Sequence, residues 1–584
     1  MALMARIVNH QIQLPETMAV LPFEESKAEQ RGGARSDLRH RRDPLGRCYR
    51  EFQYAARCRY LFNQQVALVG QQKEQSYRNH DVPILPIPCI LITTMSFEEI
   101  TRRSWLTGAA AIATQIGTAS RAETASDPLA WTLNQTASAL ARRTISSEEL
   151  TKLCLARIGR LDGVLNSFIT LDADSALNQA RECDRRRRSE HVSSRLYGIP
   201  LALKDNIDTA GLRTTAAAQV FKNRVPAEDA EVTKRLRAAG MVLLGKLNLD
   251  EMAFAGTGTT GCFGPVHNPW NPERITGGSS AGSAAAVSAG LCFASVGSDD
   301  GGSVRIPGAH CGVVGFKTSY GRVSTRGVVP SAYSMDTIGP ITRTVEDAAA
   351  LLQVLAGYDP LDAITPAEPV PDYSSALGSS IAHLRLGIPR DYFFEQLHPE
   401  VAAAVEEAIR HLRTQAKETR DVTLPRLHIA EHGDYDVELY HYQKPFFDKS
   451  PEIYHPRSQR LLNEVKNVET VAYIETLKRI RACRRDIRRV FEQVDVLLLP
   501  TMREPAPLIF ETVNETHHRP PSNTSAFNHF GTPAITLPCG FSSDGLPIGL
   551  QIVGPAWHEP VVLSVAHAYQ QSTDWHQRTP TILR

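Results

Sequence analysis

Helical and strand-like segments alternate from Ser146 onward, and this alternation restricts the possible fold more than any other feature of the sequence. Ser146-Ser147-Glu148-Glu149 has the spacing of a capping box at a helix N-terminus, and Val232 to Ala239 also has a helical pattern. Gly198 to Leu203 and Met241 to Leu244 are short apolar runs typical of buried strands. Alternation of this kind predicts a layered α/β fold. Two further strands are predicted near the C-terminus, at 533–537 and 548–553.

Length and composition limit the classes of protein to consider. With 584 residues, the chain exceeds the usual size of one core, so we expect one large domain with appendages, or two domains. A formal net charge of +1 gives no support for a nucleic-acid partner. Because no run of about 18 apolar residues occurs, we expect no stable membrane insertion. Ten cysteines without a CxxC pair are predicted to be mostly free thiols.

The front of the chain divides at Met95. Residues 1–94 show no sustained helix or strand period, so we expect them to be disordered or an upstream extension. Residues 95–122 resemble a twin-arginine export signal: Arg102-Arg103 precede a mildly apolar stretch and the small-residue sequence Ser120-Arg121-Ala122. This predicts a periplasmic or secreted protein whose enzyme domain spans 123–584. The alternative is a helix that happens to contain two arginines, in a cytoplasmic protein.

Two Gly/Ser-rich loops in the middle of the chain have the composition of a catalytic site. Residues 276–283 read Thr-Gly-Gly-Ser-Ser-Ala-Gly-Ser and open a predicted helix. Residues 299–308 read Asp-Asp-Gly-Gly-Ser-Val-Arg-Ile-Pro-Gly. Glycines directly before a serine let backbone N–H groups converge on one point, as an oxyanion hole requires. Either loop alone could be a plain turn.

Taken with their surroundings, the two loops resemble the amidase signature family. The resemblance extends to Ala202-Leu203-Lys204-Asp205-Asn206 upstream and to Cys311–Thr318 downstream, and covers roughly residues 130–580. It implies a large α/β/α sandwich with a central mixed β-sheet flanked by helices. It also implies hydrolysis of a small-molecule carboxylic amide without a metal or organic cofactor, by a stand-alone amidase that could form a homodimer.

The resemblance assigns a role to each site residue. Ser303 would attack the carbonyl, Ser279 would relay the proton after a cis Gly278–Ser279 peptide, and Lys204 would be the final base. The backbone N–H groups of Asp300, Gly301, Gly302 and Ser303 would form the oxyanion hole. Gly278, Ser280 and Arg305 would support the two loops.

This chemistry makes a specific demand on Lys204. A lysine accepts a proton only when it is neutral, and its ordinary pKa is about 10.4. Burial lowers that pKa, and the apolar neighbours Leu201 and Leu203 permit burial.

Two residues depart from the family pattern. Asp300 stands where Thr or Ile is usual, and we expect its side chain to point away from the oxyanion hole. Ala281 stands where Gly is common, which is a small change.

Several other interpretations of the site compete with this one. A glutaminase-type subunit that supplies ammonia to a tRNA-dependent amidotransferase shares the family pattern, although an export signal argues against it. A catalytically dead binding protein would not need the complete Lys/Ser/Ser set. Gly278-x-Ser280-x-Gly282 matches the nucleophile elbow of an α/β-hydrolase esterase, but Pro269 and Pro272 disfavour the strand that such an elbow needs.

Three further features remain open. His428-Ile429-Ala430-Glu431-His432 matches an inverted zinc motif, but Pro425 and Gly433 leave little helix to carry it. Lys246 is a second candidate base, although we expect it to form a structural ion pair. The aromatic segment from His432 to Tyr454 either lines a pocket for a bulky acyl group or serves helix packing.

Overall fold

The computed structural model describes residues 127–190, 192–425, 434–513 and 522–583. All of them belong to one compact unit, Gly117–Arg584. The predicted extension at 1–94, the predicted export segment at 95–122 and the zinc-like motif at 428–432 lie outside the described residues.

One mixed sheet forms the centre of the described unit. Its eleven strands run in the order β1-β3-β2-β4-β6-β5-β10-β11-β9-β7-β8. Neighbours are parallel around β2 and around β7, and antiparallel from β4 to β9. The strands are β1 (Phe168–Leu171), β2 (Pro200–Lys204), β3 (Val242–Leu247), β4 (Ala294–Asp299), β5 (Val314–Lys317), β6 (Thr337–Thr342), β7 (Arg385–Ile388), β8 (Glu418–Asp421), β9 (Val496–Pro500), β10 (Ala534–Phe541) and β11 (Pro547–Val553).

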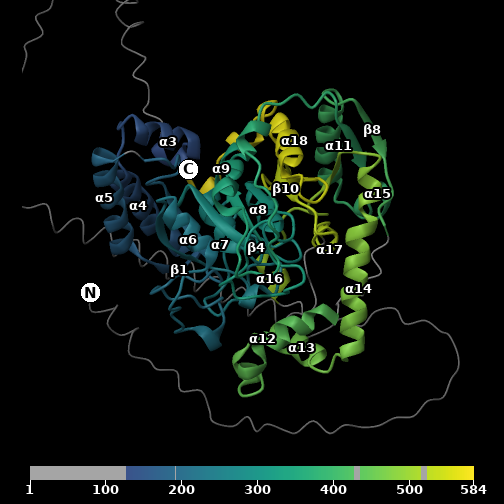
Figure 1. Cartoon of the computed structure of the whole chain (residues 1–584), viewed down its shortest axis with the longest axis horizontal. Helices are drawn as coiled ribbons and strands as arrows, with labels where there is room; N and C mark the ends of the chain where they lie inside the picture. Colours follow the sequence, from purple (N-terminus) through teal and green to yellow (C-terminus); the bar gives the residue numbers. More distant parts are fainter. Residues whose placement is uncertain (1–126, 191, 426–433, 514–521, 584) are drawn as a thin grey trace, which may run out of the picture. The chain divides into compact units, whose positions relative to one another are not determined.

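Helices surround this sheet (Figure 1), and two groups of them pack against its central strands. One group, α7 and α8, packs together against the central strands, and a second group, α9, α11 and α18, covers strands that include β6, β10 and β11. The fold is therefore the predicted α/β sandwich. The helices are α3 (Leu133–Ala141), α4 (Ser147–Leu165), α5 (Ala173–Ser189), α6 (Glu231–Ala238), α7 (Ala281–Ser288), α8 (Arg305–Cys311), α9 (Val345–Leu355), α10 (Arg390–Phe393), α11 (Pro399–Arg413), α12 (Val437–Phe447), α13 (Pro456–Val465), α14 (Thr470–Asp486), α15 (Arg488–Phe491), α16 (Ile509–Val513), α17 (Ala526–His529) and α18 (Glu559–Gln571).

Local sequence signals explain several element boundaries. Ser146 caps α4: its hydroxyl accepts from the Glu149 N–H while the Glu149 side chain accepts from the Ser146 N–H, as the capping box predicted. The predicted strands near 198–203 and 241–244 are β2 and β3, both buried along their whole length. All-buried apolar runs suit the parallel part of a sheet, because helices cover both of its faces.

The order of the strands brings the chemistry to one edge of the sheet. β2 and β4 are parallel neighbours, so their carboxyl ends meet there. β2 ends at Lys204 and β4 ends at Asp299. The loop with Ser303 follows β4 directly, and α7, which precedes β4, starts just after Ser279. Three segments that are far apart in the sequence therefore converge.

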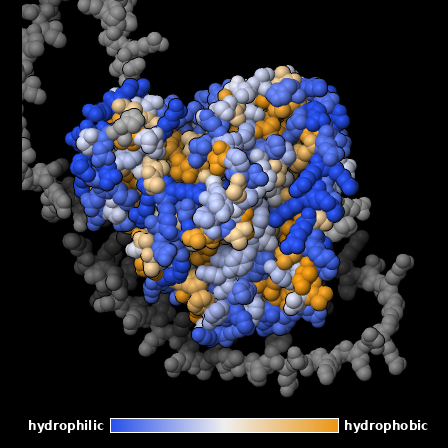
Figure 2. All heavy atoms as spheres, in the orientation of Figure 1, coloured by the Kyte–Doolittle hydropathy of each residue, from blue (hydrophilic) through white to orange (hydrophobic). Residues whose placement is uncertain are grey.

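The outer face of the unit is mainly hydrophilic in the orientation of Figure 2. Hydrophobic residues gather at the lower right, near the lower end of α14, and Val471 and Ile474 in the first turns of this helix are 68% and 49% exposed. None of the helices in the described ranges is long and apolar enough to span a bilayer. The described cysteines are free thiols, as the sequence predicted for most of the ten.

Candidate active site

Lys204 and Ser279 form a buried pair at the carboxyl edge of β2. The Lys204 ammonium nitrogen lies 2.7 Å from the Ser279 hydroxyl, and neither side chain is exposed to solvent. Burial lowers the pKa of Lys204 to about 8, although nearby carboxylates, Asp300 first among them, partly oppose this change. The lysine can therefore lose its proton near neutral pH and accept one from Ser279.

Ser298 and Ser280 hold this pair in place. The Ser298 hydroxyl accepts hydrogen bonds from the Lys204 ammonium at 2.9 Å and from the Asn206 amide at 3.0 Å. The Ser280 hydroxyl donates to the Ser298 carbonyl at 3.2 Å. Ser280 thus contacts the residue that accepts a hydrogen bond from Lys204. Its hydroxyl is fully buried, and no strand of the described fold leads into it, so it does not form a nucleophile elbow.

The two Gly/Ser-rich loops lie against each other through backbone contacts. The Ser280 N–H donates to the Ser303 carbonyl at 3.0 Å. The Gly278–Ser279 peptide is cis, as the family pattern implied. A side chain at Gly278 would clash, because an added Cβ would lie 2.0 Å from a carboxylate oxygen of Asp250. Glycine is therefore required where the first loop passes Asp250.

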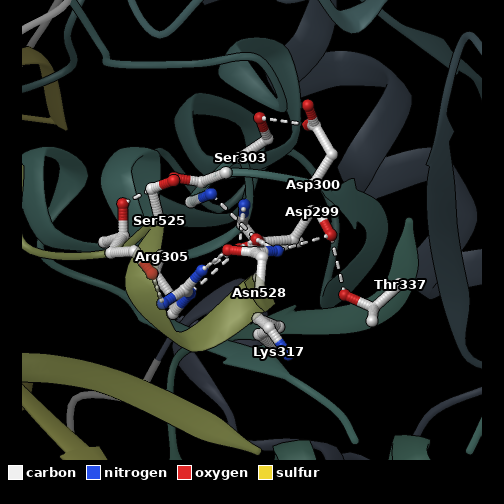
Figure 3. A network of polar contacts seen from close by, with 12 residues as sticks. Asp299, Asp300, Ser303, Arg305, Lys317, Thr337, Ser525 and Asn528 are labelled. Carbon is white, nitrogen blue, oxygen red and sulfur yellow. Dashed lines mark hydrogen bonds and ion pairs between the residues drawn. The ribbon is translucent and has the colours of Figure 1, made fainter. Parts of the chain in front are cut away.

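A buried ion pair supports the loop that carries Ser303 (Figure 3). The guanidinium of Arg305 lies 2.9 Å from Asp299, and both side chains are fully buried. Burial alone would raise the pKa of Asp299, but Arg305 and the Asn528 amide outweigh it and hold this pKa well below its ordinary value. Arg305 also donates to the Thr524 carbonyl and to the side chains of Gln551 and Asn528. Arg305 thus joins the end of β4 to residues from the C-terminal part of the chain.

One part of the predicted oxyanion hole, the N–H group of Gly302, is occupied by a hydrogen bond to Asp299. The Asp299 carboxylate accepts hydrogen bonds from the N–H groups of Gly302 at 2.8 Å and Val304 at 3.0 Å. The Gly302 N–H is therefore engaged and does not point freely into the site. The N–H groups of Gly301 and Ser303 donate to no acceptor within the described ranges, so they are the better candidates for holding an oxyanion.

Gly302 is nevertheless essential to the shape of this loop. Its φ of +131° lies in a region that side chains rarely adopt. An added Cβ would also lie 2.1 Å from the Thr524 hydroxyl oxygen. That hydroxyl donates to the Gly301 carbonyl at 2.7 Å. Thr524 therefore fixes the loop from the C-terminal part of the chain.

The prediction that Asp300 points away from the site is wrong. Its Oδ1 lies 3.3 Å from the hydroxyl oxygen of Ser303, which donates to it (Figure 3). Its Oδ2 accepts from the Ser331 hydroxyl at 3.2 Å. Among the described residues no direct hydrogen bond joins the hydroxyls of Ser303 and Ser279. The Ser303 proton is thus directed at Asp300, and it must turn before Ser279 can receive it.

Ser303 opens into a cavity of about 870 Å³. The described residues that line it include the aromatic side chains of Tyr392, Phe393, Tyr435 and Phe530 and the carboxylates of Asp300, Asp391 and Glu395. A cavity of this size accepts a small organic molecule. The site therefore combines a serine hydroxyl, a buried lysine and room for a small molecule.

The remaining candidates have structural roles. The Lys246 ammonium donates to the Ile207 carbonyl and the Thr214 hydroxyl and lies 3.5 Å from Asp205, so it forms the expected structural ion pair. Both alternatives for the aromatic segment from His432 to Tyr454 hold for part of it. Tyr435 lines the cavity, whereas Tyr440 and Phe447 are buried in a core cluster with residues of α13.

Sequence reasoning missed four residues that complete the site. Ser298 and Asp299 stand at the end of a buried strand beside the glycine loop, a position that could have marked them. Thr524 and Asn528 lie more than two hundred residues after the loop that they contact, and no local pattern signals them. Their contribution depends on the strand order, which the sequence alone does not give.

Comparisons with known proteins agree with this geometry. Residues 149–563 match the sequence model of the family described as Amidase. The A subunit of the glutamyl-tRNA(Gln) amidotransferase of Roseiflexus sp. strain RS-1 is 40% identical over 492 residues, which cover 77% of this chain and 98% of that protein.

Two solved structures have the same architecture. The A subunit of the Thermotoga maritima glutamyl-tRNA(Gln) amidotransferase has 33% sequence identity and a TM-score of 0.62, with 77% of this chain and 96% of that chain covered. A peptide amidase in complex with the competitive inhibitor chymostatin has 32% identity and a TM-score of 0.70, with 79% and 99% covered.

Proposed function

The chain belongs to the amidase family of enzymes, which act on carbon–nitrogen amide bonds, and we propose that it hydrolyses a carboxylic amide through an acyl-enzyme on Ser303. The observation that carries this proposal is the buried contact of 2.7 Å between Lys204 and Ser279, next to a loop whose serine opens into a substrate-sized cavity. A serine activated by another group in this way needs no histidine.

The proposed reaction moves one proton along the three residues. The Ser303 oxygen bonds to the amide carbon while its proton passes to Ser279, whose own proton passes to the neutral amine of Lys204. The N–H groups of Gly301 and Ser303 stabilise the negative oxygen that forms. The Lys204 ammonium returns a proton through Ser279 to the leaving nitrogen, the C–N bond breaks, and ammonia or an amine departs. Water then hydrolyses the acyl ester, which releases the carboxylate.

A panel of amides tests the proposal. The full chain is incubated with aliphatic, aryl and peptide-like amides and with glutamine, and release of ammonia or amine is measured with and without a chelator. We expect turnover of at least one amide that the chelator does not reduce, because the proposed steps use only protein groups. Loss of activity with the chelator, restored by zinc, would contradict the serine mechanism and support the motif at 428–432.

A second function is favoured by the identity of 40% to the A subunit of an amidotransferase, nearly the whole length of which is matched. In that case the same acyl-enzyme chemistry would release ammonia from glutamine for a partner protein. Turnover of simple amides by the isolated chain supports the stand-alone amidase. No turnover by the isolated chain, together with purification of the native protein in a stable larger complex, would support the amidotransferase role.

Export is part of the proposal and rests on Arg102-Arg103 and the stretch that follows them. N-terminal sequencing of the native protein tests it: we expect the mature chain to begin close after Ala122, and the protein to be found in the periplasm or the medium. A chain that begins at Met1 and remains in the cytoplasm would contradict export and strengthen the amidotransferase alternative.

A further inference from the structure

Asp300 is a carboxylate that contacts the hydroxyl of Ser303 directly. The proposed proton transfers from Ser303 through Ser279 to Lys204 do not use it. One of its oxygens accepts the Ser303 hydroxyl at 3.3 Å and the other accepts the Ser331 hydroxyl at 3.2 Å. Asp300 also lines the cavity into which Ser303 opens. Any substrate that reaches Ser303 therefore meets this carboxylate.

The position of Asp300 handicaps attack on a neutral amide in three ways. The hydrogen bond to Asp300 directs the Ser303 proton away from Ser279. A negative charge beside the loop N–H groups repels the negative oxygen that forms during the reaction. The same charge raises the pKa of Lys204 against the effect of burial, so less of the lysine is neutral and able to accept a proton.

The charge of Asp300 acts on two buried neighbours, Lys204 and Asp336. Asp336 lies nearby and accepts the N–H groups of Ser331 and Ala332 at 3.0 Å and 3.2 Å. Burial and the charge of Asp300 raise the pKa of Asp336 well above its ordinary value. Asp299 is paired with Arg305. The other carboxylates that act on these groups are Asp250, on Lys204, and Glu438, on Asp336.

The cavity itself has the same sign of charge. Besides Asp300, the carboxylates of Asp391 and Glu395 line the cavity. No lysine or arginine is among the described residues that line it. The imidazole of His529 also lines it, and burial lowers the pKa of His529 to about 4, so this ring is neutral at pH 7. A positive charge on the substrate would be attracted into such a cavity.

We propose that Asp300 is a specificity-determining residue that selects amides carrying a positive charge close to the scissile carbonyl. This inference rests on the proposed amide hydrolysis. A substrate ammonium that pairs with Asp300 replaces the hydrogen bond from Ser303, offsets the repulsion of the oxyanion and frees the serine proton for Ser279. Because Asp300 contacts the nucleophile directly, the ammonium has to lie about two or three bonds from the carbonyl carbon.

Three amides of similar length test the inference on the full chain: β-alaninamide with an ammonium group, neutral butyramide, and succinamate with a carboxylate. At pH 7 we expect kcat/KM of the wild type to be about tenfold higher for β-alaninamide than for butyramide, and lowest for succinamate. In Asp300→Asn, which keeps the shape and an oxygen acceptor, we expect this preference to fall by about tenfold, with a higher KM for β-alaninamide and a higher kcat for butyramide.

The controls separate a local effect from a general one. Asp391→Asn removes a carboxylate elsewhere in the same cavity, and it should change the preference less than Asp300→Asn does. Asp300→Thr is a second variant that also removes the charge, and Tm together with fluorophosphonate labelling of Ser303 shows that each variant is folded. Two results would overturn this inference and leave the proposed function standing. One is a wild type that does not prefer β-alaninamide, and the other is a preference that persists in both Asp300 variants. No turnover of any amide by the wild type overturns the inference together with the proposed function.

Discussion

Replacing Ser303 with alanine is expected to reduce kcat/KM for any amide substrate by roughly 10⁴-fold or more, because the acyl-enzyme cannot form without its oxygen. The same variant should lose all covalent labelling by a fluorophosphonate. Mass spectrometry of the labelled wild type should place the adduct on the peptide that contains Ser303. The side chain is only 5% exposed, so the substitution removes one small buried group and should leave the fold intact.

The matched control for this variant is Ser283→Ala. Ser283 lies in the first turn of α7, directly after the first Gly/Ser-rich loop, and is fully buried. Its hydroxyl has no hydrogen-bond partner among the described residues. Its loss should leave turnover and labelling close to those of the wild type. Labelling that persists in Ser303→Ala would show that another serine is the nucleophile, and Ser279 would then be the next residue to replace.

Lys204→Met is expected to reduce kcat by roughly 10³-fold, the usual size of a general-base contribution. Methionine fills a similar volume but cannot accept the proton of Ser279. The wild type should show kcat/KM rising with pH through about 8, because burial lowers the pKa of Lys204 to about 8 and only the neutral amine is a base. At pH 7 about one tenth of the lysine is neutral by this pKa, and the fraction increases as the pH rises. The variant should lose this pH dependence.

Lys246→Met is the control, because both lysines are fully buried on neighbouring parallel strands. Loss of Lys246 leaves the buried carboxylate of Asp205 without its ion pair, so this variant should have a lower Tm. It should keep the pH profile of the wild type. If Lys204→Met and Lys246→Met lowered Tm equally and neither changed the pH profile, Lys204 would be a structural residue and not the base.

The parts of the site that the sequence predicted correctly are those set by local pattern. The apolar neighbours of Lys204 permitted the burial that the structure shows, and the glycines before Ser279 and Ser303 predicted two tight loops. The direction of the Asp300 side chain was predicted wrongly, because it depends on the Ser331 hydroxyl, which reaches it from a different part of the chain. The hydrogen bond from the Gly302 N–H to Asp299 was missed for a similar reason. Arg305 and Asn528 hold the Asp299 carboxylate in the position where it accepts this bond, and Asn528 comes from a distant part of the chain.

The contacts of Arg305 have a consequence for how the enzyme is made. This residue lies two positions after Ser303, the proposed nucleophile. Three of its hydrogen-bond partners, Thr524, Asn528 and Gln551, nevertheless belong to the last part of the chain. A ribosome produces the serine, the lysine and both loops long before it produces these partners. Until β11 has been synthesised, the guanidinium beneath Ser303 lacks most of its acceptors. Ser303 is therefore held in its final geometry only when synthesis is nearly finished, so an unfinished chain carries Lys204, Ser279 and Ser303 without the contacts that position the Ser303 loop.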